Sequence, residues 1–587
     1  MALPLFLFLG FALLLLMGLF KIRNIGTRPK DLPPGPPTKW LLGNLLQMPK
    51  EKAYLQFKKW ADEYGPIYTL ILGTQTTIVL NDAEIVKDLL EKRSGIYSSR
   101  PEAYLSSRVA SKGLRMAGWF YNNQWRRARK ILHSILNKTS SLSFRPYQDL
   151  ETMSLLAAIL DDVNAKAPLS SATTEKAGGG QGQGQSCHHH LFDHFRRTSH
   201  SLATSIFYGF RIQDSSDPRL LQMYRNLQYF SDLAGAQAAA LLDVYPVLRR
   251  FQHLLPIYKH AVAVGEKTSE FFLGLWMPAK QKVLSSGKMS HVRPCFAISM
   301  VKAQQQEEDE KITDEEAAFI IGNAGLEAGS DTISSTLAAF VMAVVMYPEV
   351  GKRLQECVDE FTSTDDGGSI CRMPTIEDLQ DPRAQYVRAC MKEALRWMPT
   401  GILGLPHAVI RDDEYRGYKI PKDSTVVLNI WGINTDENRY KDPHTFNPDR
   451  FIHDTQTSSQ AALNPNVAER DHYTFGAGRR ICQGLHVADD FLFLGIARLM
   501  WAFNFDRAID PQTGKEIVPD RLDLIGGLLV QPAPFKMNIT PRSEKRAQMV
   551  KDAWKECQET KLDGEMQWKS VPNELSRVFP SMSEVKA

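Results

Sequence analysis

The chain has 587 residues, of which 43% are hydrophobic and 23% are charged. This ordinary globular usage excludes a collagen, a coiled coil and a wholly disordered chain. The net charge of +4 is small for the length, so no broad basic field is available for a nucleic-acid backbone, and we expect no nucleic-acid partner. Seven cysteines, an odd number, favour a reducing compartment or a cysteine kept for chemistry over a disulfide framework.

Residues 2–20 are apolar and uncharged, and at a rise of ~1.5 Å per residue they nearly span the ~30 Å hydrocarbon core of a bilayer. Four basic residues follow at once: Lys21, Arg23, Arg28 and Lys30. The positive-inside rule puts that side in the cytosol. A cleaved signal peptide would instead carry its basic residues before the apolar core. The pattern predicts a transmembrane anchor at residues 2–20 and a stiff proline-rich hinge at residues 31–37.

The rest of the chain is mostly helical in pattern, with short strand-like pieces. Residues 67–72 and 76–80 flank Gly73 and predict a hairpin. Residues 166–190 are rich in Gly and Gln and end in three histidines, which predicts a flexible surface insertion. A metal site there is disfavoured, because adjacent side chains do not face one another in regular structure. Residues 542–587 are polar and charged, which indicates a peripheral C-terminal tail.

A long helix is predicted from a capping box at Thr313–Glu316 to Met346, where Pro348 stops it. Small residues gather in its middle, including Gly322, Gly325 and Gly329. Glycine inside a helix costs up to ~1 kcal/mol, so we expect a bulky group to lie against that face.

The stretch from Phe475 to Gly484 reads FGAGRRICQG. Its glycines allow a tight turn of the backbone around a bound group. Arginines beside Cys482 predict a lowered thiol pKa and hence the thiolate, the form that binds metals. A lone cysteine cannot build a tetrahedral zinc site, but it can supply one axial thiolate to an iron held by a macrocycle. A buried structural cysteine beside a basic turn explains this stretch equally well.

The same stretch resembles the haem-binding signature of the cytochrome P450 superfamily. The five fixed positions of that signature are here Phe475, Gly478, Arg480, Cys482 and Gly484. Gln483 departs from the pattern, because many members carry proline or an apolar residue there. The resemblance implies that Cys482 binds the iron of haem b and that the other four residues bind the cofactor.

Further motifs occur along the chain in the order that the family has them, so the resemblance covers most of the chain. The chain is identified as a microsomal, fungal-like member of the superfamily. Residues 33–36 resemble the hinge of microsomal members. Trp125 and Arg129 match the WxxxR pattern whose side chains bind a haem propionate. His407 sits where members carry an arginine or histidine that reaches a propionate.

Asp331 and Thr332 lie in an AGSDT stretch that resembles the oxygen-activation motif, which implies that they are catalytic and deliver protons. Ordinary back-bonding to a helix carbonyl is the alternative for Thr332. Glu393 and Arg396 match ExxR, and Arg450 lies in a PERF-type stretch with Asp for Glu. The resemblance implies that these three form a structural ion-pair triad behind the haem.

The fold implied is mainly α with small β-sheets, the cytochrome P450 fold, in one haem domain at residues 38–541 after the transmembrane helix. About four domains would follow from length alone. The activity implied is insertion of one atom of O2 into a lipophilic small molecule, with electrons from NADPH through a separate NADPH-cytochrome P450 reductase. The anchored chain, the AGSDT stretch and the charged tail together resemble fungal members of polyketide or aromatic secondary pathways. The compartment implied is the endoplasmic reticulum membrane, with a single pass and a cytosolic catalytic domain.

Other interpretations remain open. A haem-thiolate isomerase or dehydratase would work without a reductase, and a haem sensor would not turn over. Glu327, one turn from Thr332, could orient a polar substrate group or cap a water network. Arg126, Arg127 and Lys130 could form a docking face for an acidic electron donor or simply a solvated helix face.

Overall fold

The computed structural model describes residues 23–165, 188–285, 293–306, 311–363, 372–526, 529–570 and 572–576. The predicted anchor at residues 2–20 and residues 166–187 of the predicted insertion lie outside the described residues. Residues 188–190, the end of that insertion, begin helix α8. Within the described ranges there is no group of three or more His, Cys, Asp or Glu side chains that could hold a metal ion.

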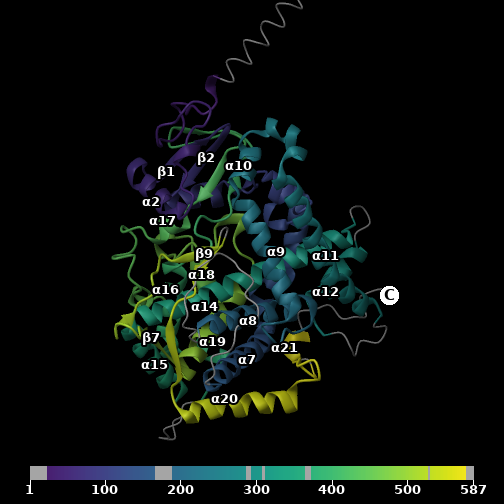
Figure 1. Cartoon of the computed structure of the whole chain (residues 1–587), viewed down its shortest axis with the longest axis vertical. Helices are drawn as coiled ribbons and strands as arrows, with labels where there is room; N and C mark the ends of the chain where they lie inside the picture. The colour runs from purple at the N-terminus through teal and green to yellow at the C-terminus, as the bar shows by residue number, and fades with distance from the viewer. Residues whose placement is uncertain are drawn as a thin grey trace, which may run out of the picture.

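Helices make up most of the molecule (Figure 1). In the first half of the chain they are α2 (Ala53–Tyr64), α3 (Ala83–Val86), α4 (Ser94–Tyr97), α5 (Asn123–Leu136), α6 (Lys138–Ser141), α7 (Arg145–Asn164), α8 (His188–Tyr208), α9 (Pro218–Gly235), α10 (Gln237–Val244) and α11 (Pro256–Ser285). In the second half they are α12 (Phe296–Gln306), α13 (Asp314–Phe319), α14 (Ala328–Met346), α15 (Pro348–Thr362), α16 (Gln385–Trp397), α17 (Ile430–Asn434), α18 (Ser458–Ala462), α19 (Leu485–Ala502), α20 (Glu544–Glu556) and α21 (Asn573–Ser576).

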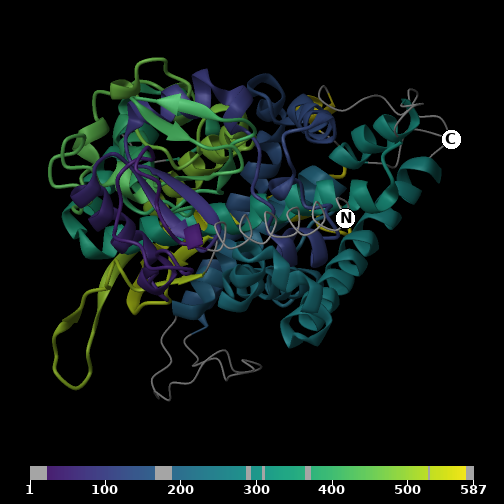
Figure 2. The ribbon, with the colours of Figure 1, turned by 90° about the horizontal axis from the view of Figure 1, so that it is seen from above.

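The strands form small sheets beside the helices, as the view from above shows (Figure 2). They are β1 (Ile67–Leu72), β2 (Gln75–Leu80), β3 (His407–Ala408), β4 (Asp413–Tyr415), β5 (Tyr418–Ile420), β6 (Thr425–Leu428), β7 (Phe503–Ile509), β8 (Glu516–Ile517), β9 (Leu524–Gly526), β10 (Val530–Pro532) and β11 (Met537–Pro541). The sheet orders are β1-β2-β6-β3, β11-β7-β8, β10-β9 and β4-β5. The predicted hairpin is confirmed: β1 and β2 are antiparallel and Leu72 pairs with Gln75.

The predicted long helix runs unbroken through α13, a π-helical segment η7 (Ile320–Glu327), and α14. Thr313 caps it, because its hydroxyl oxygen accepts a hydrogen bond of 3.1 Å from the backbone N–H of Glu316. Among the described helices this one alone is long and apolar enough to cross a membrane, but 78% of its most apolar window is buried inside the protein. It is therefore the core helix of the domain.

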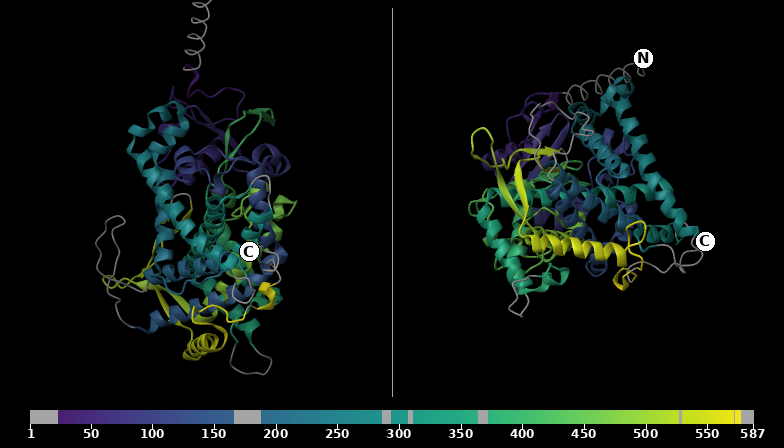
Figure 3. Two further views of the ribbon diagram at one scale, coloured as in Figure 1. Left: turned by 90° about the vertical axis from the view of Figure 1, so that its right-hand side faces the viewer. Right: turned by 60° about the horizontal axis from the view of Figure 1, so that its bottom comes forward.

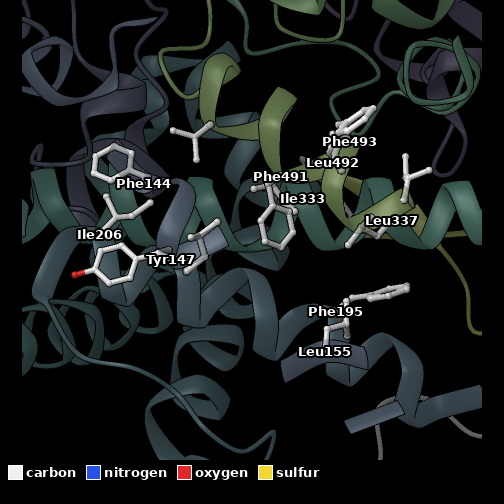
Figure 4. Packing of buried hydrophobic residues seen from close by; sticks show 14 of the residues in the cluster. Phe144, Tyr147, Leu155, Phe195, Ile206, Ile333, Leu337, Phe491, Leu492 and Phe493 are labelled. Carbon is white, nitrogen blue, oxygen red and sulfur yellow. The ribbon is translucent and has the colours of Figure 1, made fainter. Parts of the chain in front are cut away.

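Packing around this helix holds the domain together (Figure 4). Ile333 and Leu337 of α14 belong to the same buried cluster as Phe491 of α19, Leu155 of α7 and Phe195 of α8. The helix α14 packs against α8, α16 and α19. Because helices from distant parts of the sequence meet on it, its position fixes theirs.

The glycines of η7 serve the packing of aromatic rings. A Cβ atom at Gly322 would collide with the Phe272 ring, and one at Gly325 would lie 2.6 Å from the Phe207 ring. The bulky groups expected against this face are therefore phenylalanine side chains of α11 and α8 at these two positions.

The sequence indicates a charged tail after Pro541. The described part of this segment, residues 542–570 and 572–576, is folded. Helix α20 lies along one end of the molecule against α7 (Figure 3). Arg546 of α20 donates to Asp359 at 2.9 Å and lies over the Trp501 ring. Gln567 is fully buried and donates to the Ser205 hydroxyl at 3.1 Å. These contacts attach this segment to the rest of the domain through polar side chains.

Replacing Gly322 by Ala should destabilise the protein by about 1–3 kcal/mol, although alanine is the better helix former, because the new methyl group overpacks against Phe272. The matched control is Gly274→Ala in the exposed interior of α11, where a Cβ atom meets nothing within 4 Å. That variant should gain about 0.5–1 kcal/mol. The midpoints of urea denaturation measure the stability change of each variant. Equal shifts of the two midpoints in the same direction would contradict the packing argument.

Candidate active site

A cavity of about 330 Å³ lies between the long core helix (α13, η7 and α14, hereafter the central helix) and the segment around Cys482. Its walls are largely apolar and come from η7, α14, α5, α8 and the N-terminal part of α19. The structure brings most of the predicted site residues to this cavity: Trp125, Arg129, Thr332, Phe475, Arg480, Cys482 and Gly484. Asp331, His407 and Gly478 are not among the lining residues.

The backbone before Cys482 folds into a tight loop. The N–H of Cys482 donates to the carbonyl oxygen of Phe475 at 2.9 Å. Gly478 has a φ of +64°, and a Cβ atom there would collide with the carbonyl oxygen of Leu90. Only glycine fits both conditions, so Gly478 shapes the loop without contacting the cavity. Gln483 lines the cavity and donates to the backbone carbonyl of Arg129 at 2.9 Å, which joins the loop to α5.

The thiol of Cys482 opens onto the cavity, and its pKa is raised because the surrounding protein desolvates the thiolate. The N–H groups of Gly484 and Leu485 and the charge of Arg129 oppose this rise. The prediction that the two neighbouring arginines lower the pKa is wrong. Arg480 donates instead to the carbonyl oxygens of Ser98 and Trp119, and Arg479 lies over the Tyr121 ring. A metal ion on the sulfur would itself displace the proton.

Three arginines, Arg100, Arg129 and Arg480, converge on the cavity. Burial, together with mutual repulsion, lowers the pKa of Arg100 to about 9 and that of Arg480 to about 8. Burial also lowers the pKa of Arg129. Their hydrogen bonds go to backbone carbonyls, and no carboxylate in the described part of the chain forms an ion pair with them. Uncompensated buried charges are costly, so the site is complementary to a ligand with more than one carboxylate, as haem has.

Trp125 contacts two of these cations. The guanidinium of Arg480 is 4.2 Å from the centroid of its ring, and that of Arg129 is 5.3 Å away. The ring therefore holds both side chains at the cavity wall through cation–π contacts.

His407 is held behind the cavity wall in β3. Its Nδ1 lies 2.8 Å from the carbonyl oxygen of Tyr97, and burial followed by the charge of Arg100 holds its pKa well below the usual range. The imidazole is therefore neutral in the described structure, and its Nδ1–H donates to Tyr97. Arg100 occupies the cavity wall nearby, a position that no local motif in the sequence distinguishes.

The two residues predicted to deliver protons lie on different sides of α14. Thr332 lines the cavity, and its hydroxyl donates to the carbonyl of Ala328 at 2.9 Å, which is the back-bonding alternative. Asp331 does not line the cavity; it is half-buried, and desolvation raises the pKa of its carboxyl group. The charge of Arg196 on α8 opposes this rise, and Glu327 adds to it.

The predicted triad is assembled on α16 and the turn η10 (Pro448–Phe451). Arg396 makes two hydrogen bonds of 2.7 Å to Glu393, and Nε of Arg450 lies 3.4 Å from the same carboxylate. Glu393 and Arg396 are fully buried, and Arg396 also donates to the carbonyl of Asn434 at 2.7 Å. The group joins three segments of the fold and does not line the cavity.

Comparison with known proteins places this geometry in a family. The model of the family "Cytochrome P450" matches residues 33–539. The chain is 44% identical over 556 residues to cytochrome P450 monooxygenase fsoB of Humicola fuscoatra, which covers 94% of this chain and 95% of that protein. It is 42% identical over 562 residues to cytochrome P450 monooxygenase virE of Hypocrea virens, which covers 96% and 94%.

A solved structure of a zebra fish cytochrome P450 with progesterone superimposes with a TM-score of 0.62 at 22% identity, covering 83% of this chain and 99% of that chain. This likeness shows the shared fold. The family match, the fungal relatives and the fold agree. The chain belongs to the cytochrome P450 family and is a monooxygenase whose cofactor is a haem with thiolate-bound iron.

Proposed function

We propose that this monooxygenase is anchored in the endoplasmic reticulum membrane, faces the cytosol, and oxidises a lipophilic small molecule of a fungal secondary pathway, with electrons from NADPH-cytochrome P450 reductase. One atom of O2 enters a C–H bond of the substrate, and the other leaves as water with two electrons and two protons. The observation that carries the proposal is the apolar cavity with the Cys482 thiol at one wall and Thr332 on the central helix.

In this proposal Cys482 would bind the haem iron, and Arg100, Arg129 and Arg480 would bind the propionates, with Trp125 holding two of the arginines in place. Phe475 and Gly484 complete the cofactor cradle. His407 supports this wall from behind through Tyr97. The bound haem supplies the chemistry that activates dioxygen.

Proton delivery is assigned to α14. The Thr332 hydroxyl can turn from the Ala328 carbonyl to donate into the cavity, since a hydroxyl rotates to suit its acceptor. Asp331 adjoins it, and the raised pKa of the Asp331 carboxyl lets it hold a proton closer to neutral pH than an ordinary aspartic acid does. Arg196 on the far side of Asp331 is partly exposed, so the pair has a polar route toward solvent.

Electron transfer is assigned to the face of α5 beside the Cys482 loop. Arg126 and Lys130 are exposed there, whereas Arg127 lies 3.4 Å from Glu316. The hydrogen bond from Gln483 to Arg129 shows that α5 is directly behind the loop. An acidic reductase surface docked on Arg126 and Lys130 would lie close to the Cys482 loop.

Membrane contact is supported by an apolar patch on the turn η6 (Pro246–Leu254). Phe251 is 59% exposed and Leu254 is 80% exposed, and η6 has no buried residue. Tyr245 donates to the carbonyl of Leu41 at 2.8 Å, which joins this turn to the N-terminal segment where Trp40 is 60% exposed. Exposed apolar side chains gathered beside residues 23–46 favour a surface that rests on the bilayer next to the anchor.

The substrate class follows from the lining and the relatives. Most lining side chains are apolar, which favours a lipophilic molecule. Relatives at 40–44% identity are cytochrome P450 monooxygenases of fungi. The proposal places this chain with them in fungal secondary metabolism, with a polyketide or aromatic compound as its substrate.

The test is turnover with a reductase, NADPH and isotopically labelled O2 on fungal metabolite extracts. The proposal predicts a product that gains one labelled oxygen only when NADPH is present. Thr332→Ala should keep haem but lower coupling about tenfold or more, with the electrons released as hydrogen peroxide. Thr332→Ser, which keeps the hydroxyl, should restore most of the coupling. Product without NADPH would favour an isomerase, and no oxidation of any extract would favour a sensor.

Replacing Arg480 by Met should weaken haem retention by about tenfold to a hundredfold, because one charge-assisted hydrogen bond to a propionate is lost. The same change should stabilise the haem-free protein, because it removes one of three like charges that converge on the cavity. Haem transfer to a scavenger protein measures the first effect and thermal unfolding of the haem-free chain the second. Arg479→Met, on the neighbouring residue that does not line the cavity, is the control. Loss of stability in the haem-free Arg480 variant would contradict the charge argument.

A further inference from the structure

The far end of the cavity carries an amide among apolar groups. Asn323 of η7 lines the cavity and is buried within the protein. Its neighbours in the lining are Met116 and Ala117 on one side and Ala324 and Gly325 on its own helix. It lies nine residues before Thr332, about 13 Å along a helix axis. The amide is therefore well separated from the proposed proton donor.

The chemistry of its partners fixes which way the amide points. The backbone N–H of Ala117 can only donate, so the group 3.3 Å from it must be the carbonyl oxygen of Asn323. The Glu327 carboxylate can only accept, so the group 3.0 Å from it must be the amide nitrogen. An amide nitrogen has two hydrogens, and Glu327 takes one. No other acceptor in the described ranges takes the second.

The carboxylate that holds Asn323 is itself locked. The guanidinium of Arg115 forms a two-pronged ion pair with Glu327, and both side chains are more than nine-tenths buried. The Nε of Arg115 donates to the Ser111 hydroxyl at 3.3 Å, and the ring centroid of Phe230 lies 3.8 Å from its guanidinium carbon. The pair therefore joins the loop before η4 (Met116–Gly118), the central helix and α9 at the cavity wall.

This arrangement commits both Glu327 oxygens inside the protein, so Glu327 is not the group that faces a substrate. It orients the Asn323 amide instead. The π-helical turn η7 carries both residues, and such wide turns are frequent at functional sites.

We propose that Asn323 is the substrate-orienting donor of this monooxygenase: its remaining amide N–H binds a carbonyl or ether oxygen of the substrate, and the Arg115–Glu327 ion pair positions it. The inference rests on the proposed function, which supplies the haem. The substrate class is thereby narrowed to a lipophilic molecule that carries an acceptor oxygen far from the carbon that is oxidised. A molecule that lacks this oxygen binds without one fixed position in the cavity.

The test uses haem-loaded, full-length protein and 1-alkylimidazoles, whose ring nitrogen ligates the iron. A ketone oxygen is placed at successive chain positions, and each ketone is compared with the matched alkane by spectral titration. At one chain position the ketone should bind about fivefold more tightly than its alkane, the ratio that one hydrogen bond gives. Asn323→Leu should abolish that preference and change the alkane affinity by less than about twofold.

Two further variants keep the result interpretable. The double replacement Arg115→Met with Glu327→Met removes both buried charges together while Asn323 remains, and it should also abolish the ketone preference, because the amide loses its anchor. Ser335→Ala, on the same helix but away from the cavity, should keep the preference.

The outcomes separate the two proposals. If no imidazole gives a nitrogen-ligated haem spectrum, the proposed haem site fails. If the imidazoles bind but no ketone position is preferred, or if Asn323→Leu or the double variant keeps the preference, the role of Asn323 is overturned and the monooxygenase assignment stands.

Discussion

Positive charge without a counter-charge among the described residues is the constraint on which the rest of this site depends. Arg100 is buried and Arg129 and Arg480 are half-buried at one cavity, and their pKa values are depressed because burial desolvates the cations. Proteins rarely hold such a cluster unless a ligand neutralises it. In the proposed assignment, the two carboxylates of a haem would pair with these arginines and its iron would be bound by Cys482.

Proton delivery and substrate binding are proposed for two different positions along the central helix. At Thr332 it presents a hydroxyl to the cavity, next in sequence to the half-buried carboxyl group of Asp331, and we assign proton delivery to this part. At Asn323, about 13 Å away, it presents an oriented amide N–H, which suits substrate binding. Because α7, α8, α16 and α19 pack on or beside this helix, the two functions are held at a fixed separation. The π-helical turn η7 is where packing of phenylalanine rings and orientation of Asn323 meet.

Local signals in the sequence were sufficient for the hairpin, the cap at Thr313 and the tight loop at Gly478, because each depends on a few neighbouring residues. The resemblance to the family also brought Glu393, Arg396 and Arg450 together, as the structure has them. Arg100 and Asn323 were missed, because their roles come from contacts between distant segments. The prediction for the thiol pKa was wrong for a similar reason: burial raises that pKa, and Arg479 and Arg480 make their contacts with Tyr121, Ser98 and Trp119, which are distant in sequence. The packed C-terminal segment depends on Gln567 and Arg546, whose partners lie far along the chain.

The most direct test of the central claim is the absorption spectrum of the reduced carbonyl complex of the haem-loaded protein. If the thiolate of Cys482 binds the iron, the wild-type protein gives the strongly red-shifted band of thiolate ligation, and Cys482→Ala loses it. Cys357→Ala, a half-exposed cysteine away from the cavity, keeps the band. A red-shifted band that survives in Cys482→Ala would contradict the account.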